Sequence, residues 1–214
     1  MALSATGTKT DRLGSSRKRL FTSQLGDGRI TISPEHPNVF WPTPLAILAW
    51  HKSHSQIKNK SQAIKFLINT TGIHFKRKPD SSLAHDTQIQ GWPWVANTHS
   101  WVEPTALALI ALKISGFGEH QRAQQATRML LNRQMNQGGW NYGNTIVFEK
   151  ELRPFPKDTG MALNALEDQV AKERVKQSLA YLKSQVTSLF TPLSLGWGLM
   201  GLGAWGERPV DGQR

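Results

Sequence analysis

The chain has 214 residues, of which eight are tryptophan and none is cysteine, and it carries a formal net charge of +11 at pH 7. Without cysteine it can form neither a disulfide nor a thiolate metal site, so its fold must be held together by packing. No apolar run reaches the roughly 20 residues of a membrane-spanning helix, and the first residues lack the apolar core of a signal peptide. We therefore expect a cytoplasmic protein, peripheral at most to the inner face of the membrane.

Positive charge is concentrated between Lys52 and Lys78, where the chain has no acidic residue. A surface of this kind is typical of proteins that contact an anionic membrane or bind a diphosphate group. The alternative is that the charges only keep the helix faces hydrated. Nucleic acid is not an expected partner, because the basic residues are not interleaved with aromatic ones as in known nucleic-acid-binding motifs.

Helical periodicity dominates residues 13–205, and strand-type alternation is scarce. The sequence therefore predicts one all-α domain, preceded by a disordered segment at 1–12 and followed by a frayed tail at 206–214. The long connections at 73–100 and 138–157 are candidates for function, because structureless loops of this length are uncommon in compact domains. Helices are predicted, in chain order, at residues 13–23, 45–53, 56–71, 103–114, 119–136, 159–167, 172–185 and 193–202.

Short dipeptides mark the same point in successive repeats, where each opens an apolar, Ala/Leu-rich run. These dipeptides are Pro42-Thr43, Pro104-Thr105, Asp158-Thr159 and the more degenerate Thr191-Pro192. A second phrase, with charged and apolar residues at helical spacing, precedes the later runs at 63–68, 126–131 and 178–182. Neither helix of such a pair can bury its apolar face alone, so the pattern predicts stacked helical hairpins.

A Gln-x3-Gly-x-Trp turn ends one of these units, at Gln134, Gly138 and Trp140. Gln24 and Gly28 repeat its first part, and the glycines permit the positive φ that a tight turn requires. The turn resembles the QW repeat of squalene-hopene and oxidosqualene cyclases, a superfamily that also includes the β subunits of protein prenyltransferases.

The resemblance covers residues 13–205 and is most complete at 126–166. It implies an α/α toroid, in which outer and inner helices form concentric rings around an isoprenoid cavity, with no cofactor. The chain holds fewer hairpins than a closed ring, so we expect an incomplete ring. Its open flank would expose apolar surface to a protein partner or to a second copy of the chain.

The catalytic segment of the family is only partly matched. Squalene-hopene cyclases bear Asp-x-Asp-Asp-Thr-Ala at the start of an inner helix, and this chain keeps only Asp158 and Thr159 of that segment. Lys157 stands where the family has its proton donor, and an ammonium group cannot protonate an alkene. Ordinary squalene cyclisation is therefore not expected, and without cysteine the zinc site of the prenyltransferases cannot form.

Two carboxylates remain as catalytic candidates, Glu103 and Asp158. Glu103 aligns, within its own repeat, with Lys157, and burial among tryptophans would make it a general acid. The alternative is that Glu103 caps and stabilises the first turn of its helix, where the macrodipole favours a carboxylate. Asp158 has the same pair of interpretations, active-site carboxylate or helix N-cap.

Aromatic residues in the loops before the inner helices are candidates for substrate binding. Their faces stabilise a cation by about 0.5–2 kcal/mol each or cover a terpene by burial, and the alternative is packing between repeats. His99 lies four residues before Glu103 and is either a site residue or a hydrogen-bonded loop histidine; no metal site is predicted. The predicted substrate-binding residues are Trp92, Trp94, His99, Trp101 and Tyr142.

Three functions are consistent with these observations. The first is a terpenoid-cyclase-like protein that binds a polyprenyl or triterpenoid lipid, with isomerase or cyclase chemistry at Glu103 or Asp158. The second is a non-catalytic scaffold that binds a lipid or a protein. The third is a glycan-active α/α barrel with Glu103 and Asp158 as its carboxylate pair, although the Gln-x3-Gly-x-Trp turn argues against it.

Overall fold

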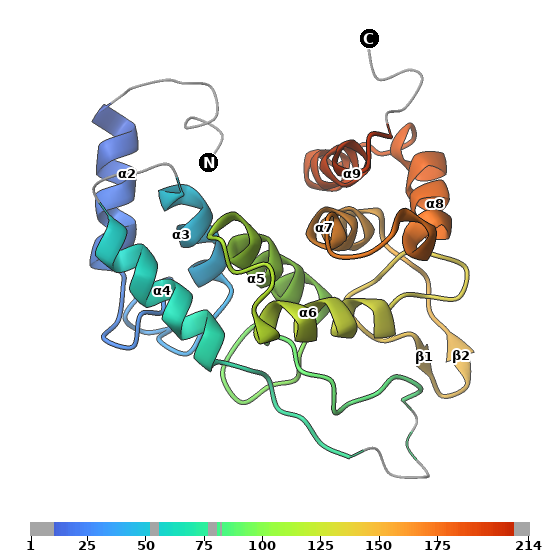
Figure 1. Ribbon diagram of the computed structural model, residues 1–214, viewed down its shortest axis with the longest axis horizontal. Helices are drawn as coiled ribbons and strands as arrows, with labels where there is room; N and C mark the ends of the chain where they lie inside the picture. The colour runs from blue at the N-terminus through green and yellow to red at the C-terminus, as the bar shows by residue number, and fades with distance from the viewer. Residues whose placement is uncertain (1–10, 52–55, 77–80, 82, 208–214) are drawn as a thin grey trace.

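The computed structural model describes residues 11–51, 56–76, 81 and 83–207, and this part of the chain is mostly helical (Figure 1). It contains eight α-helices and one short β-hairpin. The helices are α2 (Asp11–Thr22), α3 (Pro42–Trp50), α4 (Ile57–Asn69), α5 (Val102–Ile114), α6 (Gln121–Asn132), α7 (Pro156–Leu166), α8 (Lys176–Val186) and α9 (Pro192–Ala204). A 3-10 helix at Lys172–Val175 leads into α8, and the hairpin pairs β1 (Ile146–Val147) with β2 (Lys150–Glu151).

Several predicted boundaries need correction. Helix α2 begins at Asp11, inside the segment expected to be disordered. Helix α7 begins at Pro156 rather than residue 159, because proline has no N–H to lose at the first helical position. Glu207 belongs to the predicted frayed tail, yet it accepts hydrogen bonds from two lysines. The helix predicted at 45–53 is α3, which runs from Pro42 to Trp50. The predictions for 1–10, for 208–214 and for Lys52 and Lys78 concern residues outside the described part.

The helices lie in two rows. Helices α3, α5, α7 and α9 form one row in which each contacts the next, while α4, α6 and α8 pack against α3, α5 and α7 respectively (Figure 1). The sequence explains this division: α3, α5 and α9 are apolar on all sides, whereas α4 and α6 each have one apolar and one polar face. Within the first row, α5 and α7 are the most buried helices, whereas α9, at the end of the row, keeps much of its apolar surface exposed.

One hydrophobic cluster runs through both rows, from Ile30 to Leu202. Trp50, Trp92 and Trp140 are its largest fully buried side chains. A single continuous core of this kind is what stacked elements produce when each buries its neighbour.

The same hydrogen bond fixes three different loops to the starts of α3, α5 and α7. The backbone N–H of Ile30 donates to Thr43 Oγ1 at 3.0 Å. Trp92 donates in the same way to Thr105 at 3.0 Å, and Trp140 donates to Thr159 at 2.9 Å. All three threonines are fully buried. They are the threonines that the sequence aligned, so that alignment corresponds to a shared local geometry.

Two of these loops are also tied to the second row through their tryptophan rings. Trp92 Nε1 donates to the carbonyl of Leu67 at 3.0 Å, and Trp140 Nε1 donates to the carbonyl of Leu130 at 2.7 Å. Leu67 and Leu130 lie at the same distance from the ends of α4 and α6. Each ring thus satisfies its polar atom while filling the space between the rows.

The two glutamine turns each contact the start of the next helix in the second row. Gln24 Nε2 donates to the carbonyl of Asn59 in α4, and Gln134 Nε2 donates to Ser178 Oγ in α8. Gly28 and Gly138 have φ of +97° and +91°, and a Cβ on either would overlap the backbone of the helix below it. Only glycine permits both the conformation and the close approach.

Candidate functional site

Three charged side chains meet where the first turns of α5 and α7 lie side by side. Lys157 Nζ donates to Glu103 Oε2 at 2.5 Å and lies 3.8 Å from Asp158 Oδ1. Glu103 is the second residue of α5, while Lys157 and Asp158 are the second and third residues of α7. The two positions that the repeats align, Glu103 and Lys157, therefore face each other as an ion pair. We call these three residues the charged triad.

Asp158 is the most buried member of the charged triad, with 4% of its surface exposed. Burial raises its pKa to about 6, against the opposing effect of the Lys157 charge. Burial alone would lower the pKa of Lys157, but its hydrogen bond to Glu103 and the charge of Asp158 outweigh burial and raise it. The triad thus holds a charged lysine next to a carboxyl group that takes up a proton close to neutral pH.

The interpretation of Asp158 as an N-cap is wrong, because the N-cap of α7 is Phe155 and Asp158 lies inside the first turn. Glu103 does occupy the first turn of α5, where a carboxylate interacts favourably with the helix macrodipole. Its immediate partner is an ammonium group rather than the tryptophans expected around it.

An aromatic cluster lies beside the triad. The Tyr142 ring lies between those of Trp101 and Phe155, with centroid distances of 5.9 and 6.0 Å. Trp101 and Phe155 directly precede α5 and α7, so the cluster flanks the same helix starts that carry the triad. Tyr142 is 42% exposed and Phe155 43%. Sequence reasoning missed Phe155, although it directly precedes the first residue of its helix, as Trp41 and Trp101 do before α3 and α5.

The rings of Trp92 and Trp94 do not join this cluster, although the Trp101 N–H donates to the carbonyl of Trp92 at 3.0 Å. Trp92 is 1% exposed, and the guanidinium of Arg122 lies 4.0 Å above its ring, which leaves no face for a ligand. Trp94 packs edge-on against Trp41 at 6.3 Å. The structure therefore brings Trp101 and Tyr142 together, and does not place Trp92 or Trp94 with them.

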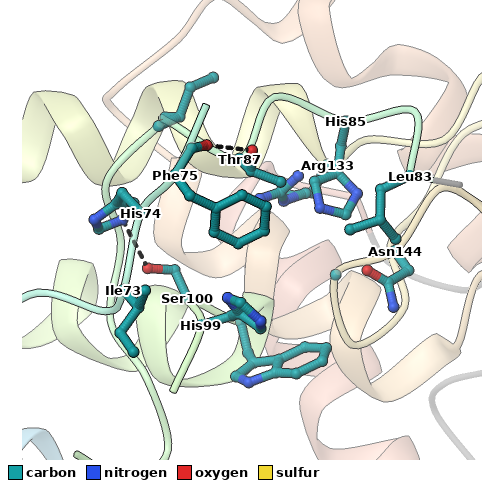
Figure 2. Close-up of a pocket in the computed structure, with 13 residues that line it drawn as sticks. Ile73, His74, Phe75, Leu83, His85, Thr87, His99, Ser100, Arg133 and Asn144 are labelled. Atoms are coloured by element: carbon teal, nitrogen blue, oxygen red, sulfur yellow. Dashed lines mark hydrogen bonds between the residues drawn. The ribbon is translucent and has the colours of Figure 1, made fainter. Parts of the chain in front are cut away.

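A small pocket lies between the connection that follows α4 and the segment that follows α6 (Figure 2). Its volume is about 40 Å³, which is room for a few water molecules or one small chemical group. A triterpenoid does not fit in it. His99 stands at this pocket, with its ring 5.3 Å from that of Phe75, and Trp101 forms part of the wall. The other lining residues are Ile73, His74, Leu83, His85, Thr87, Ile89, Ser100, Arg133, Gly143 and Asn144.

The described residues contain no group of three or more histidine or acidic side chains placed to hold a metal ion. In the same part of the chain, no helix is long and apolar enough to cross a membrane.

No protein-family model matches this sequence, and no curated protein matches it significantly. The resemblance to the QW repeat therefore depends on the residues of the turn and on the alignment of the helix starts.

Proposed function

We propose that this protein is an incomplete toroid of terpenoid-cyclase-like helical hairpins that binds a polyprenyl or triterpenoid lipid at the aromatic cluster of Trp101, Tyr142 and Phe155. The two rows of helices and the three equivalent threonine bonds support the toroidal arrangement. The observation that carries the binding proposal is the pair of half-exposed rings, Tyr142 and Phe155, grouped at the starts of two inner helices. Contiguous exposed aromatic surface of this kind marks a binding site.

The proposal is for binding rather than cyclisation. A carbocation must be shielded from water, and the rings of the aromatic cluster are open to it. Glu103 is held by Lys157, and Lys157 also separates the two carboxylates that a glycan-active site would need as a pair. The aromatic cluster therefore supports lipid recognition better than either hydrolysis or squalene cyclisation.

A second candidate function, isomerase-type proton transfer, is favoured by one observation. The buried Asp158 has its pKa raised to about 6, and a general acid works best when its pKa lies near the working pH. Asp158 is then the group that donates or accepts the proton, and Lys157 supplies a fixed positive charge next to it.

Partner contacts form the last part of the proposal. Helix α9 ends the first row, and its Leu193 and Met200 side chains are 62% and 48% exposed. This apolar flank supports a protein partner or self-association, as in the scaffold alternative. Exposed Lys58 and Lys65 on α4 support contact with an anionic membrane surface on the cytoplasmic side.

Binding is tested with polyprenyl alcohols, polyprenyl diphosphates and squalene, followed by tryptophan fluorescence and native mass spectrometry. The double variant Tyr142→Ala/Phe155→Ala should weaken binding at least about tenfold, because it removes most of the exposed apolar surface of the cluster. Phe190→Ala is the matched control, since Phe190 is 96% exposed and lies in the connection between α8 and α9. Equal weakening by both variants, or by neither, would remove the aromatic cluster as the binding site.

Proton transfer is tested by incubating the same lipids, together with oxidosqualene, with the wild type, Glu103→Gln and Asp158→Asn. We expect any isomerised or cyclised product to be lost in Asp158→Asn. A product that survives in Asp158→Asn would show that this carboxyl group is not the acid.

A further inference from the structure

Arg133 is a buried cation without a compensating anion among the residues that the structure describes. It follows the last residue of α6, and only 4% of its surface is exposed. Its Nη1 reaches Asn132 Oδ1 at 3.5 Å, the outer limit of a hydrogen bond, and its Nε has no acceptor among the described residues. Burial lowers its pKa to about 10, so the side chain remains charged at neutral pH. An unpaired buried charge is strongly destabilising, which calls for a partner.

The carboxylates of the described chain do not provide that partner. None lies within ion-pair distance of Arg133, and no aspartate or glutamate lines the pocket. The backbone N–H of Asp86 donates to Asn132 Oδ1 at 3.1 Å, but the Asp86 carboxylate accepts the backbone N–H of Gln88 at 2.9 Å instead of pairing with Arg133. The carbonyl end of α6 offsets part of the charge through the helix dipole, but it leaves Nε unbonded.

His85 is a second unsatisfied group on the same pocket. Its side chain is buried, with 7% exposed, and its Nδ1 has no hydrogen-bond partner among the described residues. Figure 2 shows Arg133 and His85 both turned toward the pocket. Two buried nitrogens without partners at one small cavity are rare in a native structure and need a common explanation.

The lining combines apolar side chains, such as Ile73 and Ile89, with further basic and hydrogen-bonding groups. His74 Nε2 lies 3.3 Å from Ser100 Oγ, and His99 stands on the same wall. Burial lowers the pKa of His74, and the charges of Arg122, Arg133 and His99 lower it further. The pocket therefore has a positive potential that an anion would neutralise.

We propose that this pocket, which we call the Arg133 pocket, binds a single oxyanion group, a carboxylate or a phosphate, through Arg133 and His85. The planar guanidinium matches the paired oxygens of either group, and charge-assisted bonds of this kind are the strong ones. The volume of about 40 Å³ suits one such group and not a whole lipid. The two sites share Trp101, but this inference does not depend on the proposed lipid site, because it rests on Arg133 and His85, which are not members of the aromatic cluster.

The test uses inorganic phosphate and acetate as separate probes of the full-length protein, at pH 7 and constant ionic strength with chloride as the reference anion. Histidine ring signals are followed by NMR, with those of His85 and His74 assigned from substitution variants. We expect one probe or both to cause saturable shifts at His85 and His74. The tighter of the two identifies the group as a phosphate or a carboxylate.

Arg133→Met should raise the dissociation constant at least tenfold, while Arg128→Met, an exposed arginine on the same helix, should leave it unchanged. His85→Gln provides an independent variant if Arg133→Met fails to fold, and it should also weaken binding. Saturable binding that is equal in wild type, Arg133→Met and His85→Gln would overturn the proposal, as would no saturable shift with either probe.

Discussion

The two ends of α6 each carry a buried arginine, and the two residues differ in the partners that surround the guanidinium. Burial lowers the pKa of both Arg122 and Arg133 to about 10. Arg122 donates to the carbonyl of Thr70 at 2.7 Å and to Gln125 Oε1 at 2.6 Å, and its guanidinium covers the Trp92 ring. Among the described residues, the Arg133 side chain has a single hydrogen bond, at the distance limit, and no acceptor for its Nε.

We interpret the Arg122 charge as structural and the Arg133 charge as part of a ligand-binding site. Where the fold needs a buried guanidinium, as at Arg122, it supplies carbonyl acceptors and an aromatic face, which offset the loss of water. At Arg133 the described chain supplies almost no hydrogen-bond acceptors, although the free-energy cost of burying the guanidinium is similar. Stability measurements and titrations can test this contrast directly.

The largest effect is expected from Arg122→Met, which should destabilise the protein by about 4 kcal/mol. The change removes charge-assisted bonds and the contact with Trp92, and it leaves the carbonyl of Thr70 without this donor. Urea unfolding followed by circular dichroism measures the loss. A loss below about 1 kcal/mol would mean that the Arg122 contacts are not structural.

The charge of Asp158 is compensated less fully than that of Arg122 and more fully than that of Arg133. Asp158 is buried, but its Oδ1 lies 3.8 Å from Lys157 Nζ. Its pKa of about 6 in the folded protein exceeds its ordinary value of 3.8, so the folded protein holds a proton that the unfolded chain has released. The Asp158 contribution therefore becomes more stabilising as the pH falls from about 6 to about 4, and is lost as the pH rises again.

We expect the wild type to gain about 2–3 kcal/mol relative to Asp158→Asn between pH 7 and pH 4. Urea unfolding of both proteins at the two pH values measures this gain, and the histidines contribute equally to both. A difference between the proteins that does not change with pH would contradict the raised pKa.

A smaller effect is expected from Arg133→Met, which should stay within about 1 kcal/mol of the wild type, or exceed it, when no anion is added. Methionine keeps much of the volume and removes an uncompensated charge. The same unfolding measurement in chloride buffer decides the point. A loss as large as that of Arg122→Met would make the two arginines equivalent and end the contrast.

The smallest effect is on His74. Because Arg133 is among the charges that lower the pKa of His74, Arg133→Met should raise that pKa toward its ordinary value. Histidine NMR titration measures the change, with Arg128→Met as the control that should not move it. An unchanged pKa of His74 would mean that the charge of Arg133 does not act on the groups that line the pocket.

Much of the helical arrangement could be predicted from the sequence, because apolar runs and their punctuation are local signals. Helix α5 begins one residue before its predicted start, and the aligned residues Thr43, Thr105 and Thr159 all accept the same loop bond. The β1–β2 hairpin is too short to show alternation, and so it has no signal that sequence reasoning can detect.

The sites were less predictable, because they depend on pairings between distant elements. The alignment of Glu103 with Lys157 marks equivalent positions, but only the packing of α5 against α7 makes them an ion pair. Arg122 and Arg133 look like ordinary charged residues of an amphipathic helix, and their burial follows from the loops that cover them. Trp92 appears in the sequence as a loop aromatic, yet it fills the core.

The repeated threonine bond has a consequence for how this scaffold can change. The donor and the threonine are 13 residues apart in the first two cases and 19 in the third, while the bond itself is the same. The longer connection accommodates the β1–β2 hairpin without disturbing the helices on either side. These connections are therefore the natural places for insertion and diversification: new recognition surfaces can be grafted there while the helical framework keeps its register.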